Sequence, residues 1–430
     1  MARDTAFNLT ITALSPVHIA SGSQIAEGYD FIADKEQQVV HVVNDEAALL
    51  LADQKLNQRA QQTKKLVTEF SNSPPKQKQQ AEKKEQELRG RIADEKRFRE
   101  ELFRSLTLTD LIDEKRRLLT LRDLRENPEI EGQPLVRYTL RGQLSNGNSI
   151  NEQIKDVFGR AYIPGSSLKG AIRTALGWQL FKEHGLQARP PQGSGRPNSK
   201  TADDEYETRL FTIAGDGNAV NRDVWRGLRV SDSTPLDDAL MLAPIRISKQ
   251  ARPGQEPFDV LNVEAIPKDS QTTATIHLDE YLLGPLPQRE RGLNYAAKAD
   301  ALRGFAAACR ERGAALIDAE LAYYRERNDR PLLQRFYQDL QGQAHALPET
   351  SFMLQLGWGT GWHSKTFDDR LSENAPLFAE IVDAYRLQPQ RKQPFAEGDL
   401  FPATRKLVLE GMQSAAPLGW VRVDVNEVVR

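Results

Sequence analysis

The chain has 430 residues, of which 39% are apolar and 27% are charged, and its formal net charge is -2. This length and apolar content suit two or three folded domains and argue against a fibre or a tail. The charge balance excludes a strongly basic nucleic-acid-binding chain, so a polyanion site would have to be local, made by a few clustered Lys and Arg side chains.

The sequence contains one cysteine, Cys309, and six scattered histidines. Neither a disulfide framework nor a cysteine-type zinc site can be built from them, and we expect no metal and no cofactor. The sequence has no apolar run near the ~20 residues that a membrane span requires. The opening "MARDTAFNLTITAL" also lacks the layout of a secretory signal. We therefore expect a cytoplasmic protein that does not contact membranes.

The first 130 residues change character near residue 45. "FNLTITALSPVHI" predicts a half-buried strand from Phe7, and "YDFIADKEQQVVHVV" predicts strand, turn and strand over residues 29–43. From Asp45 to about Arg125 the sequence is rich in Gln, Lys, Glu and Arg, with sparse apolar residues at helical spacing and a Ser-Pro-Pro interruption at 73–75. This pattern predicts two solvated helices. Acidic residues accompany the basic ones throughout, which favours an exposed helical insertion over an RNA-binding arm.

The rest of the chain mixes strands and helices. "LVRYTLRGQL" predicts a strand, "AYIPGSSLKGAIRTAL" a strand end, a turn and a helix, and "LQARPPQGSGRPNSK" a loop. "LRVSDSTP" and "MLAPIRISK" predict strands, and "VLNVEAIPKDSQTTATIHL" predicts a hairpin. Helical periodicity follows over residues 293–340, then "SFMLQLGWGTGWHSKT" as a strand entering a glycine-rich loop, and "PLGWVRVDV" as a closing strand. This order favours two α+β domains with largely antiparallel sheets.

The stretch "IPGSSLKGAIR" is the first candidate anion site. A helix N-terminus offers free N–H groups, Gly165 and Gly170 would let another backbone approach, and a serine is expected to cap the helix. Lysine and arginine four residues apart share one helix face and could reach one sugar-phosphate strand. The candidate donors are Ser166, Ser167, Lys169 and Arg173. An ordinary amphipathic helix with a good cap explains the same spacing.

The stretch "LGWGTGWHSKT" is the second candidate. Glycines at alternate positions weaken a strand unless a backbone or ligand must come close, and Trp358 and Trp362 offer faces for base stacking. A tight structural turn with two core tryptophans is the alternative, whereas the spacing of a dinucleotide fingerprint is absent. The candidate residues of this loop are Gly357, Gly359, Thr360, Gly361, His363, Ser364, Lys365 and Thr366.

The stretch "SPVHIASGS" is the third candidate, with His18, Ser21 and Gly22. His18 could act as a general base, contact RNA, or be a hydrogen-bonded core histidine, which is the favoured interpretation. Near the C-terminus, adjacent Arg405 and Lys406 are interpreted as solvated surface.

Taken together and in this order, these motifs resemble the RAMP superfamily of CRISPR-associated RNA-binding proteins. Within it, "YDFIADKEQQVVHVV" and "FPATRKLVLEGMQSAAPLGWVRV" look most like the fifth Csm subunit, which caps the type III-A effector filament at the 3′ end of the guide RNA. The resemblance spans most of the chain and departs at residues 45–130 and in the loop after Gly185.

The resemblance implies an α+β fold of two ferredoxin-like (RRM-like) modules with antiparallel sheets, plus the charged helical insertion. It places the N-terminal module at 1–44 with 130–250, the insertion at 45–129 and the C-terminal module at 251–430. It also implies a role in antiviral defence through crRNA binding, with the candidate residues of the first two motifs along the guide backbone and His18, Ser21 and Gly22 at a third edge. The implied partners are crRNA, target RNA, and the backbone and small filament subunits of the Csm complex. Recognition should be sequence-independent, because one complex accepts many guides.

Three hypotheses about activity follow. A non-catalytic RNA-binding subunit comes first, because the resemblance points to a non-catalytic member. A metal-independent endoribonuclease comes second, because cleavage would need a general base such as His18 or His363 and a charge stabiliser such as Lys365. A structural adaptor, with the RNA held only by neighbouring subunits, comes third. As to identity, the alternative is another RAMP subunit of a related type III complex.

Overall fold

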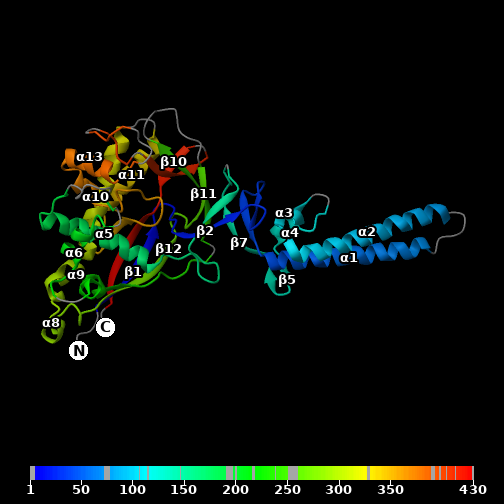
Figure 1. The fold of residues 1–430 in the computed structure, drawn as a ribbon, viewed down its shortest axis with the longest axis horizontal. Helices are drawn as coiled ribbons and strands as arrows, with labels where there is room; N and C mark the ends of the chain where they lie inside the picture. The colour runs from blue at the N-terminus through cyan, green and yellow to red at the C-terminus, as the bar shows by residue number, and fades with distance from the viewer. Residues whose placement is uncertain are drawn as a thin grey trace. The chain divides into compact units, whose positions relative to one another are not determined.

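The computed structural model describes residues 5–71, 78–105, 107–113, 116–145, 147–189, 197–198, 201–215, 218–237, 239–249, 260–326, 330–388, 393–396, 399–402, 404–411 and 413–428. The chain divides into two compact units (Figure 1). Unit 1 contains Met1–Gly22 and Glu152–Arg430, and unit 2 contains Ser23–Asn151. The Ser-Pro-Pro interruption expected between the two long helices lies outside the described residues.

One antiparallel sheet of unit 1 joins the beginning, middle and end of the chain. Its strand order is β13-β16-β1-β12-β9, and its central strand, β1 (Thr5–Ala13), alternates buried and partly exposed residues as its sequence predicts. β1 pairs along its length with β12 (Gln271–Leu278) on one side and with β16 (Trp420–Val428) on the other. β9 (Leu228–Val230) and β13 (Ser351–Gln355) lie at the two edges.

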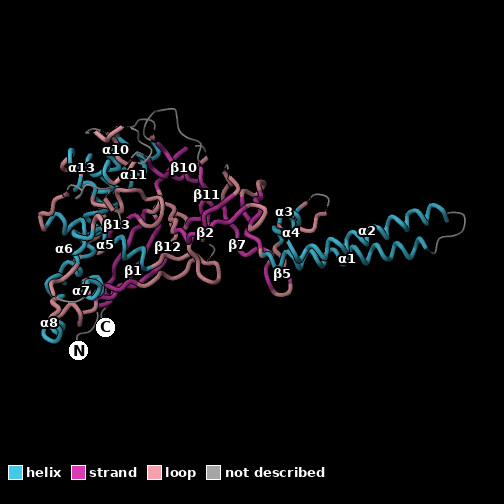
Figure 2. Tube along the Cα trace, in the orientation of Figure 1, coloured by secondary structure: helices cyan, strands magenta, loops and turns pink. Residues whose placement is uncertain are grey.

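Two helices complete this sheet as a ferredoxin-like arrangement. The chain order β1, α5 (Gly165–Glu183), β9, β12, α10 (Phe305–Arg325) and β13 is that of a β-α-β-β-α-β unit. The helices α5 and α10 pack against each other, and Figure 2 shows helices gathered beside the strands of this unit. The sheet therefore includes strands from both of the modules that the sequence predicts, and the module boundaries at 1–44 with 130–250 and at 251–430 stay a prediction.

A second group of antiparallel strands in unit 1 is built around β10 (Met241–Lys249). β10 pairs with β11 (Val260–Ala265) on one side and with β14 (Thr404–Glu410) on the other, and β14 pairs with β15 (Gln413–Pro417). The predicted hairpin over residues 260–278 is wrong: β11 pairs with β10, whereas β12 pairs with β1 and β9. β11 and β12 are therefore adjacent in sequence but belong to two different sheets.

Further helices of unit 1 are short, apart from α11 (Pro331–His345), which packs on α10. Leu321, Tyr337 and Trp420 belong to the core cluster between these helices and the sheets, and all three are essentially inaccessible to solvent. The short elements are α6 (Asp204–Phe211), α7 (Ala219–Arg222), α8 (Leu286–Arg291), α9 (Ala299–Arg303), α12 (Asp368–Leu371), α13 (Ala375–Ala384), and the 3-10 turns η2 (Val224–Gly227) and η3 (Tyr295–Lys298).

Unit 2 contains the charged helical insertion. The helices α1 (Asp45–Ser71) and α2 (Lys78–Ser105) lie side by side (Figure 1), and Arg99 pairs with Asp53 between them. At the base of α1, residues such as Leu51 and Leu118 form an apolar cluster. The other elements of the unit are β3 (Phe31–Asp34), β4 (Val39–Val43), α3 (Leu108–Ile112), α4 (Leu121–Glu126), β5 (Glu129–Ile130), β6 (Gln133–Pro134) and β7 (Val136–Arg141). Two strands, β2 (Ala20–Ala26) and β8 (Ser149–Gln153), cross the division between the units.

The predicted fold class is confirmed. The chain is α+β, its described sheets are built from antiparallel pairs, and the insertion is helical as its composition predicts. None of the helices in the described residues combines the length and the apolar character that crossing a membrane demands.

Candidate nucleic-acid interface

The helix α5 begins differently from the prediction. Its N-cap is Pro164 in an extended conformation, with no side-chain cap from either predicted serine. The amide of Gly165 instead donates to Asp232 Oδ1 at 2.8 Å, an acceptor 67 residues away. A Cβ at Gly165 would collide with the carbonyl oxygens of Val230 and Ser231, so the close approach predicted there is confirmed. At Gly170 the described residues make no such approach, because none of their atoms outside its own helix backbone lies within 4 Å of its Cβ position.

The hydroxyl-bearing residues at this helix start remain accessible. Ser166 is exposed and Ser167 is partly exposed, with its amide donating to Pro164 O at 2.9 Å. Both therefore can meet a ligand, and their role in RNA binding stays a prediction.

The two candidate cations of α5, Lys169 and Arg173, are engaged within the protein. Lys169 Nζ donates to the carbonyls of Trp225 and Leu228 at 2.9 and 2.6 Å, and its burial lowers its pKa. Arg173 lies 3.2 Å from a carboxylate oxygen of Glu207 and 3.3 Å from one of Asp223. Lys169 thus fixes the loop before β9, whereas Arg173 is about a quarter exposed, with a side-chain exposure of 26%.

The glycine-rich loop, residues 357–366, packs its first turn against the loop that contains His18. Gly357, Gly359 and Gly361 all have φ between 85° and 91°, a left-handed conformation that favours glycine. A Cβ at Gly357 would collide with His18 O, and the next amide, Trp358 N, donates to that same oxygen at 2.8 Å. Two of the three sequence motifs are therefore brought together by direct backbone contact.

His18 is a core histidine, as favoured from the sequence. It is 1% exposed, its Nδ1 lies 2.7 Å from Glu264 O, and its burial lowers its pKa. Its ring meets Trp358 edge to face at 5.6 Å between centroids. Ser21 and Gly22 lie beyond it in β2 and are exposed.

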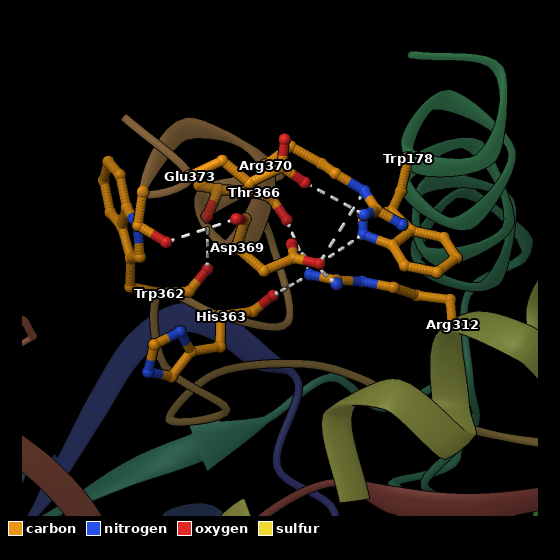
Figure 3. Close-up of polar contacts among 9 residues, drawn as sticks. Trp178, Arg312, Trp362, His363, Thr366, Asp369, Arg370 and Glu373 are labelled. Carbon is orange, nitrogen blue, oxygen red and sulfur yellow. Dashed lines mark hydrogen bonds and ion pairs between the residues drawn. The ribbon is translucent and has the colours of Figure 1, made fainter. Parts of the chain in front are cut away.

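The far end of the glycine-rich loop is held by a residue that the sequence motifs did not identify. Arg312 of α10 is 3% exposed, and its Nη2 donates to His363 O at 2.6 Å and to Thr366 O at 2.8 Å (Figure 3). Its Nη1 donates to Asp369 Oδ1 at 3.0 Å, and the other oxygen of that carboxylate accepts from Trp178 Nε1 of α5 at 2.7 Å. One buried guanidinium thus links α5, α10 and the loop. An arginine among the apolar residues of an amphipathic helix was the only signal for it in the sequence.

The middle of the loop carries His363, Thr360 and Ser364. His363 Nε2 lies 3.2 Å from Arg405 Nη2 and 3.9 Å from Glu320 Oε1, so the side chain belongs to an Arg–Glu–His group. Thr360 and Ser364 donate their hydroxyls to Gly357 O and Gly361 O, at 3.4 and 3.3 Å. These contacts shape the turn from within.

Lys365 at the end of the loop and Lys406 of β14 lie near each other. Lys365 is accessible, and Lys406 of β14 lies over the ring of Trp358, with Nζ 4.9 Å from the centroid. Burial lowers the pKa of both lysines, and the charge of Lys365 lowers that of Lys406 further. The described residues place no carboxylate within ion-pair distance of either. The interpretation of Arg405 and Lys406 as solvated surface is wrong, because Arg405 is largely buried beside Glu320 and Lys406 is partly buried against Trp358. A pair of cations such as Lys365 and Lys406 is suited to a phosphate.

A cavity of about 420 Å³ brings the first and second motifs together. Its wall includes Arg173 and Thr174 from α5, and Trp362, Lys365 and Thr366 from the glycine-rich loop. Ser166 and Ser167 lie about two turns earlier on α5 and do not contribute to this wall. The described residues contain no group of three or more His, Cys, Asp or Glu side chains able to hold a metal ion.

Comparisons with known proteins place this arrangement in a family. The chain is 24% identical over 333 residues, 74% of this chain and 75% of the relative, to "CRISPR system Cms protein Csm5" of Methanocaldococcus jannaschii. It is 35% identical over 95 residues, 22% of this chain and 24% of the relative, to the protein of the same description from Streptococcus thermophilus.

Two solved structures share the fold. A chain in a structure described as "Csm-crRNA-target RNA ternary complex in type III-A CRISPR-Cas system" aligns over 98% of this chain and 100% of its own length, with a TM-score of 0.58 and 22% identity. A crystal structure of T. onnurineus Csm5 aligns over 96% of this chain and 99% of its own length, with a TM-score of 0.54 and 22% identity. The predicted likeness to the fifth Csm subunit is confirmed. The family model described as "RAMP superfamily" matches residues 10–363, and the chain belongs to that superfamily.

Proposed function

We propose that the chain is a non-catalytic, crRNA-binding subunit on the 3′-end side of a type III-A Csm effector complex. The relatives described as Csm5 support the assignment to that complex. The observation that carries the RNA-binding part is the shared cavity, because it brings Arg173 of the α5 motif beside Lys365 and Thr366 of the glycine-rich loop.

The proposed RNA path runs along the glycine-rich loop. Lys365 and Lys406 provide positive charge without a nearby carboxylate among the described residues, so a phosphate can neutralise them. The accessible hydroxyl of Ser166 extends the path along α5. Contacts to phosphate and ribose read no sequence, which suits a subunit that accepts many guides. Its partners are crRNA, target RNA and the neighbouring backbone and small filament subunits.

The burial of His18 supports the non-catalytic assignment. His18 is buried, and its Nδ1 is occupied by Glu264 O, so a ribose hydroxyl outside the core is beyond its reach. His363 is the better candidate for a general base, because its side chain is 28% exposed. Its proximity to Arg405 is the one observation that favours an endoribonuclease as the second candidate.

A footprint on the guide tests the proposal. The complex is assembled from type III-A subunits and crRNA, with and without this chain, and is treated with a 3′→5′ exonuclease. We expect the chain to protect additional nucleotides at the 3′ end. An identical 3′ boundary in both assemblies would refute the capping role, and new protection elsewhere on the guide would assign the chain to another RAMP position.

The same material tests catalysis. Labelled precursor RNA incubated with the protein in EDTA should stay uncut. Defined cleavage that disappears in His363→Ala, but persists in His184→Ala on the exposed end of α5, would replace the binding assignment with the nuclease.

A further inference from the structure

The cavity beside the glycine-rich loop has the composition of a small-molecule site. Its volume of about 420 Å³ falls within the range of about 300–1,000 Å³ that is typical of such sites. The walls come from α5, α6, α13 and the end of the loop. Sites of this kind combine apolar and aromatic walls with a few placed polar groups.

Aromatic rings form much of the wall. Phe181 lies at the centre of this group, with Tyr206 and Phe367 at 5.6 and 6.0 Å between ring centroids. Phe211 is covered by the Arg173 guanidinium, 4.3 Å from its centroid. Flat aromatic and guanidinium surfaces are the surfaces on which unpaired bases stack.

The polar groups of the wall suit the edge of a base. The guanidinium of Arg189 also lies in the wall and can donate to a base carbonyl or ring nitrogen. The carboxylate of Glu207, which pairs with Arg173, is an acceptor for an exocyclic amino group.

The cavity is also continuous with the proposed RNA path. Lys365 and Thr366 belong to the glycine-rich loop and to the cavity wall, and the charge of Lys365 acts on Lys406 outside it. A strand whose phosphates meet the two lysines therefore has a base within reach of the cavity. A protein segment bound here would be attracted by Lys365 and Lys406 only if it were acidic, whereas every RNA strand carries the negative charge that they require.

We propose that this cavity holds one unstacked nucleobase of the single RNA strand that passes along the glycine-rich loop. The inference rests on the proposed RNA-binding function and adds a subsite to it. At this point of the strand, one base leaves the stack and lies between the aromatic rings of the cavity. The phosphate next to that base contacts Lys365. Any of the four bases can enter, because every base offers a face for stacking.

Photocross-linking tests the subsite. The type III-A complex is assembled with the full-length chain and with guides that carry a single 5-iodouridine at successive positions near the 3′ end. After irradiation, the cross-linked residues are identified by mass spectrometry. We expect one guide position to cross-link to the cavity aromatics, with Tyr206 or Phe367 as the modified residue, and its neighbours to cross-link elsewhere.

A cavity-filling variant supplies the control. Thr174 lines the cavity, and its hydroxyl donates to Gly170 O of the same helix at 3.1 Å, so Thr174→Trp fills the space without removing a hydrogen bond between α5 and another described element. We expect it to reduce that cross-link about tenfold, in line with the strength of base–aromatic stacking. Gln179→Trp adds the same ring to the same helix outside the wall and should leave the cross-link unchanged.

The outcomes separate the subsite from the function it rests on. A protected guide whose cross-links all fall outside the cavity, or a cross-link that survives Thr174→Trp, overturns the subsite and leaves RNA binding standing. A chain that neither protects nor cross-links to the guide overturns both.

Discussion

Removing the lysine pair beside Trp358 is the sharpest test of the RNA path. In Lys365→Ala/Lys406→Ala, two cations are lost from the point where the glycine-rich loop meets β14. Each phosphate neutralised on a single strand contributes about 0.7 to the slope of log affinity against log salt, so the variant should lose about 1.4 of that slope. Between 50 and 200 mM salt, the wild-type affinity should then fall about sevenfold further than the affinity of the variant.

The assay is equilibrium binding of labelled single-stranded RNA to the assembled complex at several salt concentrations. Lys64→Ala/Lys65→Ala is the matched control, because it removes two exposed lysines from α1 in the insertion and should leave the slope unchanged. The fold should not suffer in the site variant, since burial already disfavours the charged form of both lysines. An unchanged slope in a folded site variant would refute the RNA path and favour the structural adaptor.

Further predictions concern the supports of the loop and its titration. Arg312→Met should lower the free energy of unfolding by about 1–3 kcal/mol, because it removes the buried donor to the loop carbonyls of His363 and Thr366, and urea unfolding measures the loss. Gly357→Ala should lower the free energy of unfolding by about 1–3 kcal/mol or more, because alanine is strained at positive φ and its Cβ would collide with the His18 carbonyl. An unchanged urea midpoint would contradict that packing. As the pH rises, RNA affinity should begin to fall below the ordinary lysine pKa of about 10.4, because Lys365 and Lys406 have lowered pKa values and bind phosphate only when protonated. The affinity of the Lys365→Ala/Lys406→Ala variant should show no such fall in that pH range.

The sequence predicts features that depend on local chemistry. Alternation in β1 and the solvated composition of α1 and α2 are enough to predict strand and helix. Gly357 was identified as a place of close approach because glycine is otherwise unfavourable after a strand, and the neighbouring carbonyl proves to be that of His18.

Features that depend on distant partners could not be predicted. Asp232, not a neighbouring serine, accepts from the first amide of α5, and Lys169 donates to carbonyls more than fifty residues away. Likewise, Lys406 is next to Arg405 in sequence, yet its important neighbour is Lys365 from another segment. Pairing of this kind is set by how the sheets assemble, and no local pattern in the sequence records it.

The strand β1 lies at the centre of the five-stranded sheet β13-β16-β1-β12-β9, and this position has a consequence for biosynthesis. Residues 5–13 leave the ribosome well before their two neighbours, residues 271–278 and 421–428. At about 5–20 residues per second, the strand waits tens of seconds for its second neighbour. Newly made chains should therefore expose an apolar, unpaired segment for most of translation, which makes them clients for a ribosome-associated chaperone and prone to aggregation when synthesis outpaces it.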